Sequence, residues 1–342
     1  MNQFSLVDCT TVDGALSQLN DSSVVKAAGV DLLDRMKNGT ATPSRLVNIR
    51  NIAELRGIHP SPQGVTIGAL TTLTEISEHP LIRSEYTILS DACGSVATPH
   101  IRNMATLGGN LLQQLQCWYF RSEEFQCLRK GKEICFAFEG LNQYHAIMDY
   151  GSCPSVAPSS SAVALLGLNA SVELSSAGRG KRMVAIKDLY VHPDANPTKF
   201  NVVEPDELLT AVVIPRPAKG TRSAYQKYGE KQSNDWAIAD AGVVLEMDGN
   251  VCRKAAIVMG AASPVVRHSA EAEAVLAGKP ISEETARAAG KAAMQGGPLQ
   301  TAMQGAQPLS MNAYKVQLFP VAIYRTILLA AGQMGRDPSA AG

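Results

Sequence analysis

Hydrophobic and polar positions alternate in short blocks along the first 57 residues, and each block is too short to form a long helix. The blocks predict helices over 11–19 and 31–37 and strands over 23–29 and 45–49. Thr11 stands where a side-chain oxygen normally caps a helix. Because a strand–turn–helix–strand order usually makes two parallel strands, the region 1–57 is predicted to be a small α/β subdomain.

The region 58–220 repeats this mixture of strands and helices over a longer stretch. Its pattern predicts strands over 64–70 and 207–214, helices over 71–76 and 86–93, and a passage from helix to strand over 161–174. Pro215 and Pro217 end the last strand. We therefore expect a second α/β subdomain at 58–220, interrupted by an irregular insertion at about 114–155.

From residue 221 onward the pattern changes. It predicts antiparallel strands over 222–228, 237–247 and 252–260, followed by helices over 269–277, 282–294 and 313–332. Asp248-Gly249-Asn250 is a typical hairpin turn. The region 221–342 is therefore predicted to be a C-terminal domain with a three-stranded antiparallel sheet and three helices, and the whole chain is assigned to the α+β class. The tail, 336–342, is expected to fray.

Charge and composition narrow the class of function. Lys plus Arg and Asp plus Glu number 31 each, so the net charge is zero, which argues against nucleic acid as the main partner. No segment reaches 18 uninterrupted apolar residues, so no membrane span is expected. The first residues have neither the basic nor the apolar region of a secretory signal. The seven cysteines then fit a reducing compartment better than a disulfide scaffold.

Four of those cysteines fall within one short stretch, at Cys117, Cys127, Cys135 and Cys153. Iron–sulfur clusters are held by thiolates, usually four of them for a [4Fe-4S] centre. A long irregular loop needs an internal reason for order, which a buried cluster would supply. The spacing matches no compact zinc or ferredoxin motif, so zinc and four unrelated thiols stay open as alternatives. The isolated cysteines, interpreted as core residues, are Cys9, Cys93 and Cys252.

Two turns of small residues follow strand-like segments and could hold phosphate groups. They are Lys26-Ala27-Ala28-Gly29-Val30-Asp31 and Thr106-Leu107-Gly108-Gly109-Asn110. A helix N-terminus offers free N–H groups and a positive dipole end to an anion, and consecutive amides can form an anion nest. Ordinary turns often look similar, but two such turns favour a dinucleotide site. Neither contains G-x-G-x-x-G, so a Rossmann site is not indicated.

These motifs resemble those of a known family, the FAD-binding medium subunits of molybdenum hydroxylases, the xanthine dehydrogenase and carbon monoxide dehydrogenase group. The resemblance covers nearly the whole chain. Its anchors are Ala-Ala-Gly-Val-Asp-Leu-Leu at 27–33, Thr-Leu-Gly-Gly-Asn at 106–110, Ala-Pro-Ser-Ser at 157–160, Glu-Leu-Leu-Thr at 207–210 and Tyr-Gln-Lys-Tyr at 225–228. It implies a vanillyl-alcohol-oxidase-type fold for about 1–220, with FAD between the two α/β subdomains.

The resemblance also implies which residues meet the FAD. A first motif would hold the pyrophosphate through backbone amides, and its members are Val25, Lys26, Ala27, Ala28, Gly29, Val30, Asp31 and Leu32. The other expected contacts are Thr106, Gly108, Gly109, Asn110, Ser160, Leu209 and Lys227, the last reaching the flavin. Three positions depart from the family pattern, because Ala28 and Val30 replace a Gly and a Thr and Ser160 replaces an Asp.

The insertion resembles that of a subgroup with an additional [4Fe-4S] cluster. This subgroup includes the bacterial periplasmic-type aldehyde oxidoreductases and, more distantly, 4-hydroxybenzoyl-CoA reductase. The resemblance implies that the cluster ligands are Cys117, Cys127, Cys135 and Cys153.

The function implied by this resemblance is electron transfer within a complex. A large partner subunit with molybdopterin would oxidise an aldehyde or aromatic substrate, and a small partner with [2Fe-2S] clusters would pass the electrons on. This chain would accept them at FAD and deliver them to an external acceptor. The alternative is a flavin-free scaffold subunit whose FAD pocket has decayed. The expected location is the cytoplasm, or the periplasm if the chain is exported folded with a signal-bearing partner.

Overall fold

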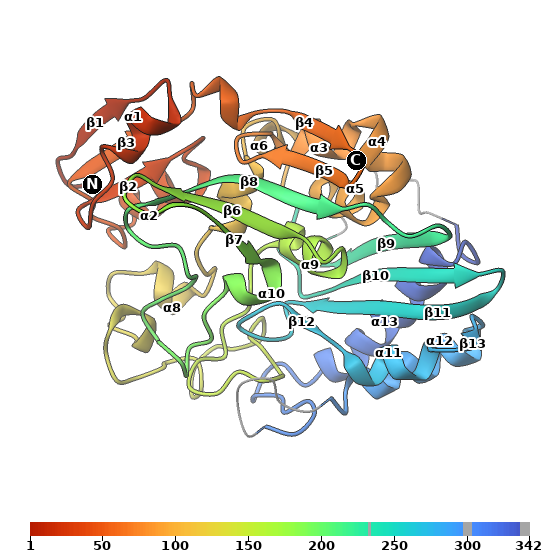
Figure 1. Cartoon of the computed structure of the whole chain (residues 1–342). Coiled ribbons are helices and arrows are strands. Elements are labelled where there is room, and N and C mark those ends of the chain that lie inside the picture. The colour runs from red at the N-terminus through yellow and green to blue at the C-terminus, as the bar shows by residue number, and fades with distance from the viewer. Residues whose placement is uncertain (232–233, 297–302, 336–342) are drawn as a thin grey trace.

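A computed structural model of the chain describes residues 1–231, 234–296 and 303–335, so the tail expected to fray lies outside it. Within these ranges the strands form three sheets, which follow one another along the chain (Figure 1). The fold is mixed α+β, as predicted. No helix in the described part of the chain is both long and apolar enough to cross a membrane.

The first sheet has the parallel arrangement that the sequence predicted. Its order is β1 (Ser5–Asp8), β3 (Arg45–Asn48) and β2 (Ser23–Lys26), with both outer strands parallel to β3. The helices of this region are α1 (Val12–Leu16), α2 (Val30–Lys37) and a 3₁₀ turn at Ala53–Leu55. Thr11 caps α1 by accepting the Gly14 N–H, as expected. The strand β1 was not predicted, because this four-residue edge strand is largely exposed and has no alternating pattern.

The second sheet is entirely antiparallel. Its order is β4 (Ile58–Ser61), β5 (Gly64–Gly68), β8 (Glu207–Pro215), β6 (Ser171–Ser176) and β7 (Gly180–Ala185). The accompanying helices are α3 (Leu73–Glu78), α4 (Pro80–Glu85), α5 (Thr87–Gly94), α6 (Pro99–Arg102), α7 (Leu107–Leu111), α9 (Ser160–Gly167) and α10 (Ile186–Leu189). The two outer strands were not predicted. Pro60 lies in β4, and β7 is largely exposed and polar, so both lack the usual strand signal.

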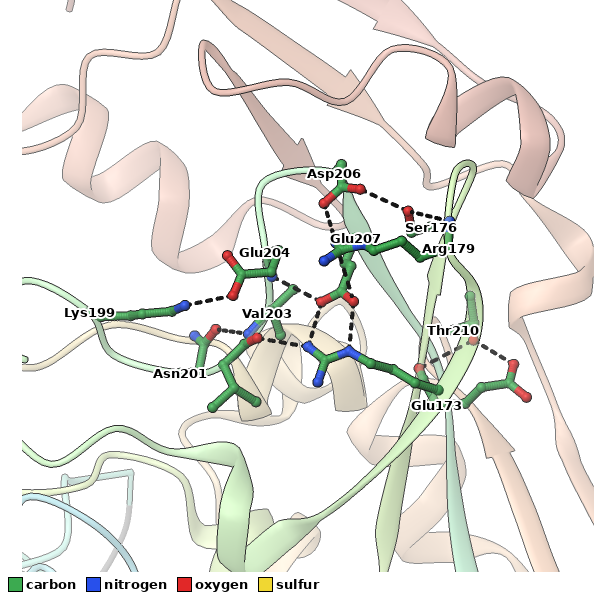
Figure 2. A network of polar contacts seen from close by, with 12 residues as sticks. Glu173, Ser176, Arg179, Lys199, Asn201, Val203, Glu204, Asp206, Glu207 and Thr210 are labelled. Atoms are coloured by element: carbon green, nitrogen blue, oxygen red, sulfur yellow. Dashed lines mark hydrogen bonds and ion pairs between the residues drawn. The ribbon is translucent and has the colours of Figure 1, made fainter. Parts of the chain in front are cut away.

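A buried carboxylate fixes the start of β8 against β7 (Figure 2). Glu207 accepts hydrogen bonds from Arg182 Nε and Nη2, both at 2.7 Å, and from the Glu204 N–H at 3.0 Å. These donors lower the pKa of Glu207, with the Arg182 hydrogen bonds as the largest cause. The contact anchors the Glu-Leu-Leu-Thr segment in the sheet.

The third sheet belongs to the C-terminal region. The three long strands are antiparallel as predicted, and they are β9 (Thr221–Tyr228), β10 (Ala239–Asp248) and β11 (Val251–Gly260). Two short strands, β12 (Arg267–His268) and β13 (Lys279–Pro280), also pair with β11, so the sheet has five strands instead of the predicted three. The helices α11 (Ala270–Leu276), α12 (Glu283–Ala293) and α13 (Lys315–Ala330) share an apolar core with this sheet (Figure 1).

The insertion has little regular structure, as the sequence indicated. In it the chain forms α8 (Trp118–Arg121) and a 3₁₀ turn at Leu128–Lys130. One anchor is the ion pair of Arg121 with Asp31 of α2, at 2.5 Å.

A second anchor of the insertion lies next to α13. The Asn142 side chain accepts the Met311 N–H at 2.9 Å, and Asn312 Nδ2 donates to the carbonyl oxygens of His145 and Ala146 at 3.1 and 3.2 Å. Both asparagines are fully buried. The insertion is therefore held between the first and the third sheet regions.

Candidate functional site

A cavity of about 320 Å³ lies where three distant parts of the chain meet. Residues 96–101 before and within α6 form one wall, and residues of the insertion and of the segment leading to α9 form a second. The third wall comes from β9, β10 and the segments beside them, and it includes Lys227, Asp240 and Ala261. The lining is mostly apolar with a few polar groups, which is the usual make-up of a cofactor site.

Backbone strain is concentrated at this cavity. Five non-glycine residues in the described part of the chain have positive φ, and three of them, Ala97, Asn234 and Ala261, line the cavity. Alanine seldom adopts φ values of 43° and 54°, because its Cβ clashes with the backbone. Such strain tends to gather at functional sites, where the surrounding structure enforces it.

Two lysines and one aspartate lie at or just behind the cavity, and Asp240 and Lys315 among them are buried. Lys227 Nζ donates to the carbonyl oxygens of Ser95 and Asp235, the latter at 2.9 Å. Asp240 is 2% exposed, and the Tyr225 hydroxyl donates to its Oδ2 at 2.7 Å. Burial raises the pKa of the Asp240 carboxyl to about 6, although Tyr225, Lys227 and Lys315 all oppose the rise.

Lys315, at the start of α13, is fully buried behind the cavity. Its Nζ donates to the carbonyl oxygens of Tyr144 and Ala261, at 3.0 and 3.1 Å. Burial lowers the pKa of this ammonium to about 7, and the charge of Asp240 partly offsets the effect. The lysine thus joins the insertion to the wall of the cavity that carries Ala261.

A second, much smaller cavity of about 10 Å³ is lined by all four cysteines of the insertion, Cys117, Cys127, Cys135 and Cys153. None of them forms a disulfide. The Cys135 thiol donates a hydrogen bond to the Cys153 sulfur, which lowers the pKa of Cys153. Burial raises the pKa of Cys117 to about 12. The structure therefore brings together the four cysteines that the sequence singled out.

The arrangement is not that of a site for a single metal ion. In the described ranges, no group of three or more His, Cys, Asp or Glu side chains is placed to hold one. A lone tetrahedral zinc ion needs thiolates about 2.3 Å from one point. The zinc alternative therefore gains no support from the geometry.

A cation lies beside the cysteines. Arg129 lines the small cavity, is 6% exposed, and stacks over the Phe200 ring with 4.1 Å to the centroid. Its Nε and Nη1 are buried and have no hydrogen-bond partner among the described residues. Burial lowers the pKa of this guanidinium, while Cys153 and Cys127 act in the opposite direction. An unpaired buried cation is costly, so the site suits an anionic group.

The two cavities share a wall. Cys117 and Ser155 line both of them. His145, which faces the larger cavity, places Nε2 at 3.3 Å from Cys117 Sγ. Trp118 packs edge-on against His145, with 5.7 Å between the ring centroids. A group bound in the small cavity would thus lie directly beside a group bound in the large one.

The first expected FAD motif lies at the end of β2 and the start of α2. Gly29 precedes α2 with a φ of 85°, and no side chain caps the helix there. The first N–H groups of α2 are therefore not bound by a capping side chain, which leaves them able to meet an anion. Asp31 instead points to the insertion, where it accepts the Gln114 N–H at 3.2 Å and pairs with Arg121. Neither this motif nor the second one lines the large cavity.

The second expected motif is a helix start and not an open turn. Thr106 caps α7 by accepting the Gly109 N–H, and Asn110 Oδ1 accepts the Ser159 hydroxyl at 2.7 Å. A Cβ at Gly108 would lie 3.1 Å from Ala69 Cβ, so this glycine permits close packing of the helix. Because Gln114 follows α7 and binds Asp31, the two motifs are neighbours in space.

The remaining predicted contacts divide into two groups. Ser160 and Lys227 line the large cavity, together with Cys117. Leu209 is buried in the core of the second sheet region, opposite Leu174 of β6, and does not reach the cavity. Asp240 was not singled out by sequence reasoning. Its signal was available, because it is the one acid among Ala237 to Leu245, in an otherwise apolar strand.

Comparison with known proteins gives a consistent result. A family model described as the FAD binding domain in molybdopterin dehydrogenase matches residues 2–217. A second model, described as the CO dehydrogenase flavoprotein C-terminal domain, matches residues 223–330.

Individual relatives agree with these matches. The aldehyde oxidoreductase FAD-binding subunit PaoB of Escherichia coli is 31% identical over 226 residues, which cover 66% of this chain and 71% of that protein. The carbon monoxide dehydrogenase medium chain of Afipia carboxidovorans is 30% identical over 78% of this chain and 76% of its own. Among solved structures, the carbon monoxide dehydrogenase from Hydrogenophaga pseudoflava matches with a TM-score of 0.73 and 24% identity, covering 98% of this chain and 99% of that chain.

Proposed function

The chain belongs to the family of FAD-binding subunits of molybdopterin dehydrogenases, and from this premise we propose that it is an electron-transfer subunit carrying both FAD and a [4Fe-4S] cluster. The observation that carries the proposal is the shared wall of Cys117 and Ser155 between the four-cysteine cavity and the large cavity. Electrons would reach FAD from a small [2Fe-2S] subunit and leave to an external acceptor.

The residues present fit FAD. The uncapped start of α2, from Gly29 to Leu32, would hold the pyrophosphate through backbone amides, whereas the first amides of α7 already donate to Thr71, Ala69 and Thr106. The large cavity, with Ser160 and Lys227 in its wall, would hold the flavin ring. Bound FAD supplies the reversible uptake of electrons, while the chain positions the ring and excludes water from it. Ala28 and Val30 differ from the family pattern in their side chains, whereas the pyrophosphate would be bound by main-chain amides. The two differences should therefore leave the pyrophosphate contact in place.

Four free cysteines line one cavity, and a [4Fe-4S] cluster takes one thiolate on each of its irons, so we infer the cluster from the number and kind of these ligands. Arg129 supplies a buried positive charge beside them. Because a thiolate-ligated cluster is anionic, this cation would stabilise it and tune its potential.

Partners and substrate follow from the relatives. Relatives such as the carbon monoxide dehydrogenase medium chain are, by their names, one chain of a larger assembly. We therefore infer a molybdopterin-binding large subunit and a [2Fe-2S] small subunit as partners. The similarity to an aldehyde oxidoreductase subunit makes an aldehyde the proposed substrate of the complex.

The proposal is tested by the metal and flavin content of the chain purified with its partners. Cys135→Ser should lower the iron bound by this chain while leaving its FAD in place. Cys252→Ser is the control, because Cys252 lies in the C-terminal region away from the cysteine cavity and donates a hydrogen bond to the Lys254 carbonyl, which a serine hydroxyl can also make. Unchanged iron in Cys135→Ser would refute the ligand set. Iron without FAD in the unmodified chain would favour the flavin-free scaffold.

A further inference from the structure

We propose that Asp240 is a cofactor-binding residue of this chain, whose free carboxylate oxygen accepts a hydrogen bond from an N–H group of the flavin ring in the large cavity. The inference rests on the proposed function, because it takes FAD as the occupant of that cavity. Asp240 lies in β10, is 2% exposed and lines the cavity.

The carboxylate is held at one oxygen and open at the other. Tyr225 donates to Oδ2, whereas Oδ1 is buried and has no hydrogen-bond partner within the ranges that the structure describes. A buried carboxylate oxygen without a donor is energetically costly. Since this oxygen belongs to a residue in the wall of a cavity, the missing donor is best supplied by a ligand.

The strand next to Asp240 is built to leave room for the carboxylate. Gly260 of β11 lies directly opposite Asp240. A Cβ at this position would lie 2.2 Å from Oδ1 and 2.4 Å from Oδ2, so any side chain there would displace the acid. Glycine at 260 and aspartate at 240 therefore form a matched pair across the two strands.

The polar groups around Asp240 favour its ionised form without occupying Oδ1. They are the neutral Tyr225 hydroxyl, which donates to Oδ2, and the charged Lys227 of β9 and Lys315 of α13, both of which donate to main-chain carbonyls. Among the described residues neither lysine forms an ion pair with Asp240. With a pKa of about 6, the carboxyl is ionised at neutral pH and is a strong acceptor.

The chemistry of the acid identifies which part of FAD it meets. A carboxylate repels the phosphates, which are anionic, so they belong at the uncapped start of α2 and not at Asp240. The isoalloxazine ring carries N–H donors, and hydrogen bonds to ring nitrogens are among the means by which proteins tune flavins. Asp240 therefore orients the ring, together with Lys227 on the same side of the cavity.

The test is a titration of the deflavinated, full-length chain with FAD, for the unmodified chain and for Asp240→Asn. A hydrogen bond to a charged group predicts about 10- to 100-fold weaker binding at pH 8 in the variant. The affinity of the unmodified chain should fall as the pH drops below about 6, because the protonated carboxyl accepts less strongly, whereas the variant should show no such fall. Loss of the buried negative charge should also raise the midpoint potential of bound FAD.

Two further variants make the result decisive. Gly260→Ala displaces the carboxylate without removing it and should weaken FAD binding in the same direction, even if Asp240→Asn folds poorly. Asp248→Asn makes the same chemical change at an exposed position of the same strand and should leave the affinity unchanged. Equal affinity and an equal pH profile in Asp240→Asn would overturn the inference and leave FAD binding intact. Failure of the unmodified chain to bind FAD would overturn the proposed function itself.

Discussion

At residue 97 an alanine holds a backbone conformation that normally belongs to glycine, with a φ of 43°. Arg102 fixes it there, because Nη1 of the guanidinium donates to the carbonyl oxygens of Val96 and Ala97 at 3.1 and 2.8 Å. The strain is therefore enforced by a specific contact at the edge of the large cavity.

Ala97→Gly should stabilise the chain. Relief of a left-handed conformation gains about 1–2 kcal/mol, and the extra freedom of glycine in the unfolded chain removes about 0.5–1 kcal/mol of it. The expected net rise in the free energy of unfolding is about 0.5–1 kcal/mol, measured by denaturant titration. Ala237→Gly is the control, because Ala237 lines the same cavity without a positive φ, and it should lower stability by a similar amount. A loss of stability in both variants would show that Ala97 is unstrained.

The buried acid also makes a prediction about stability in the absence of FAD. The pKa of Asp240 is about 6 in the folded chain, against an ordinary value of 3.8. Between these values the folded state binds more protons than the unfolded state, so stability falls as the pH rises through this window. Asparagine does not titrate. Asp240→Asn should therefore gain stability relative to the unmodified chain from pH 4 to pH 6, reaching a constant advantage of about 1–3 kcal/mol above pH 6.

This stability profile separates two roles for the acid. If Asp240 only stabilised the fold, its replacement would lower the free energy of unfolding of the chain more at pH 7.5 than at pH 4.5. An aspartate kept for a ligand should show the opposite trend, because its burial is compensated only when the ligand is bound. Urea unfolding of the FAD-free chain at the two pH values distinguishes the cases.

At the scale of elements, one ion pair ties the insertion to the helix expected to hold the pyrophosphate. The Arg121 side chain is 11% exposed, pairs with Asp31 of α2, and donates from Nε to the Leu115 carbonyl at 2.6 Å. Arg121→Met leaves a partly buried carboxylate without its partner, so we expect a loss of about 2–4 kcal/mol in the free energy of unfolding. FAD binding should weaken as well, because α2 loses its contact with the insertion.

The matched control for this ion pair is Arg179→Met. Arg179 also pairs with an aspartate, Asp206, at 2.5 Å, but its side chain is 54% exposed. Solvent screening makes such pairs worth little, so the expected loss is under about 1 kcal/mol. Equal losses in thermal or urea unfolding would mean that the Arg121 contact is not structural.

The elements with strong local signals could be predicted from the sequence. Thr72 and Glu75 form a reciprocal capping box at the start of α3, and the hairpin of β10 and β11 turns at Asp248-Gly249-Asn250. Elements without a strong local signal could not be predicted. The strand β7 is polar and forms because it pairs with β6. The helix α7 was interpreted as a turn because it has only five residues and two of them are glycines.

At the scale of the molecule, the segment before α13 clamps the insertion. Asn312 accepts the Leu309 N–H at 2.6 Å and donates to two carbonyls of the insertion. Asn312→Ala leaves these buried groups without partners, so stability should fall by about 3 kcal/mol and iron content should fall with it. Asn103→Ala, which removes one exposed hydrogen bond to Thr74, should cost under about 1 kcal/mol and leave iron unchanged. Normal iron in Asn312→Ala would show that the clamp does not order the cysteines.

The candidate site could be predicted only where the type and spacing of the residues indicate a chemical role. Four cysteines in one irregular stretch predicted a shared site, and the structure places all four around one cavity. The proximity of Asp240 and Lys315 could not be predicted from the sequence, since they lie 75 positions apart and come near each other only through the packing of α13 on the third sheet. The same packing sets the pKa values of both groups, which no local pattern contains.

The partition formed by Cys117 and Ser155 has a thermodynamic consequence. Because Cys117 and Ser155 line both cavities, any movement of these residues when a group binds in the small cavity also changes the shape of the large one. The occupancies of the two cavities are therefore linked. Linkage is reciprocal: if the inorganic centre tightens retention of the flavin by some factor, the flavin must tighten retention of the inorganic centre by the same factor. If the proposed flavin and inorganic centre stabilise each other in this way, a chain that loses either group should release the other more readily.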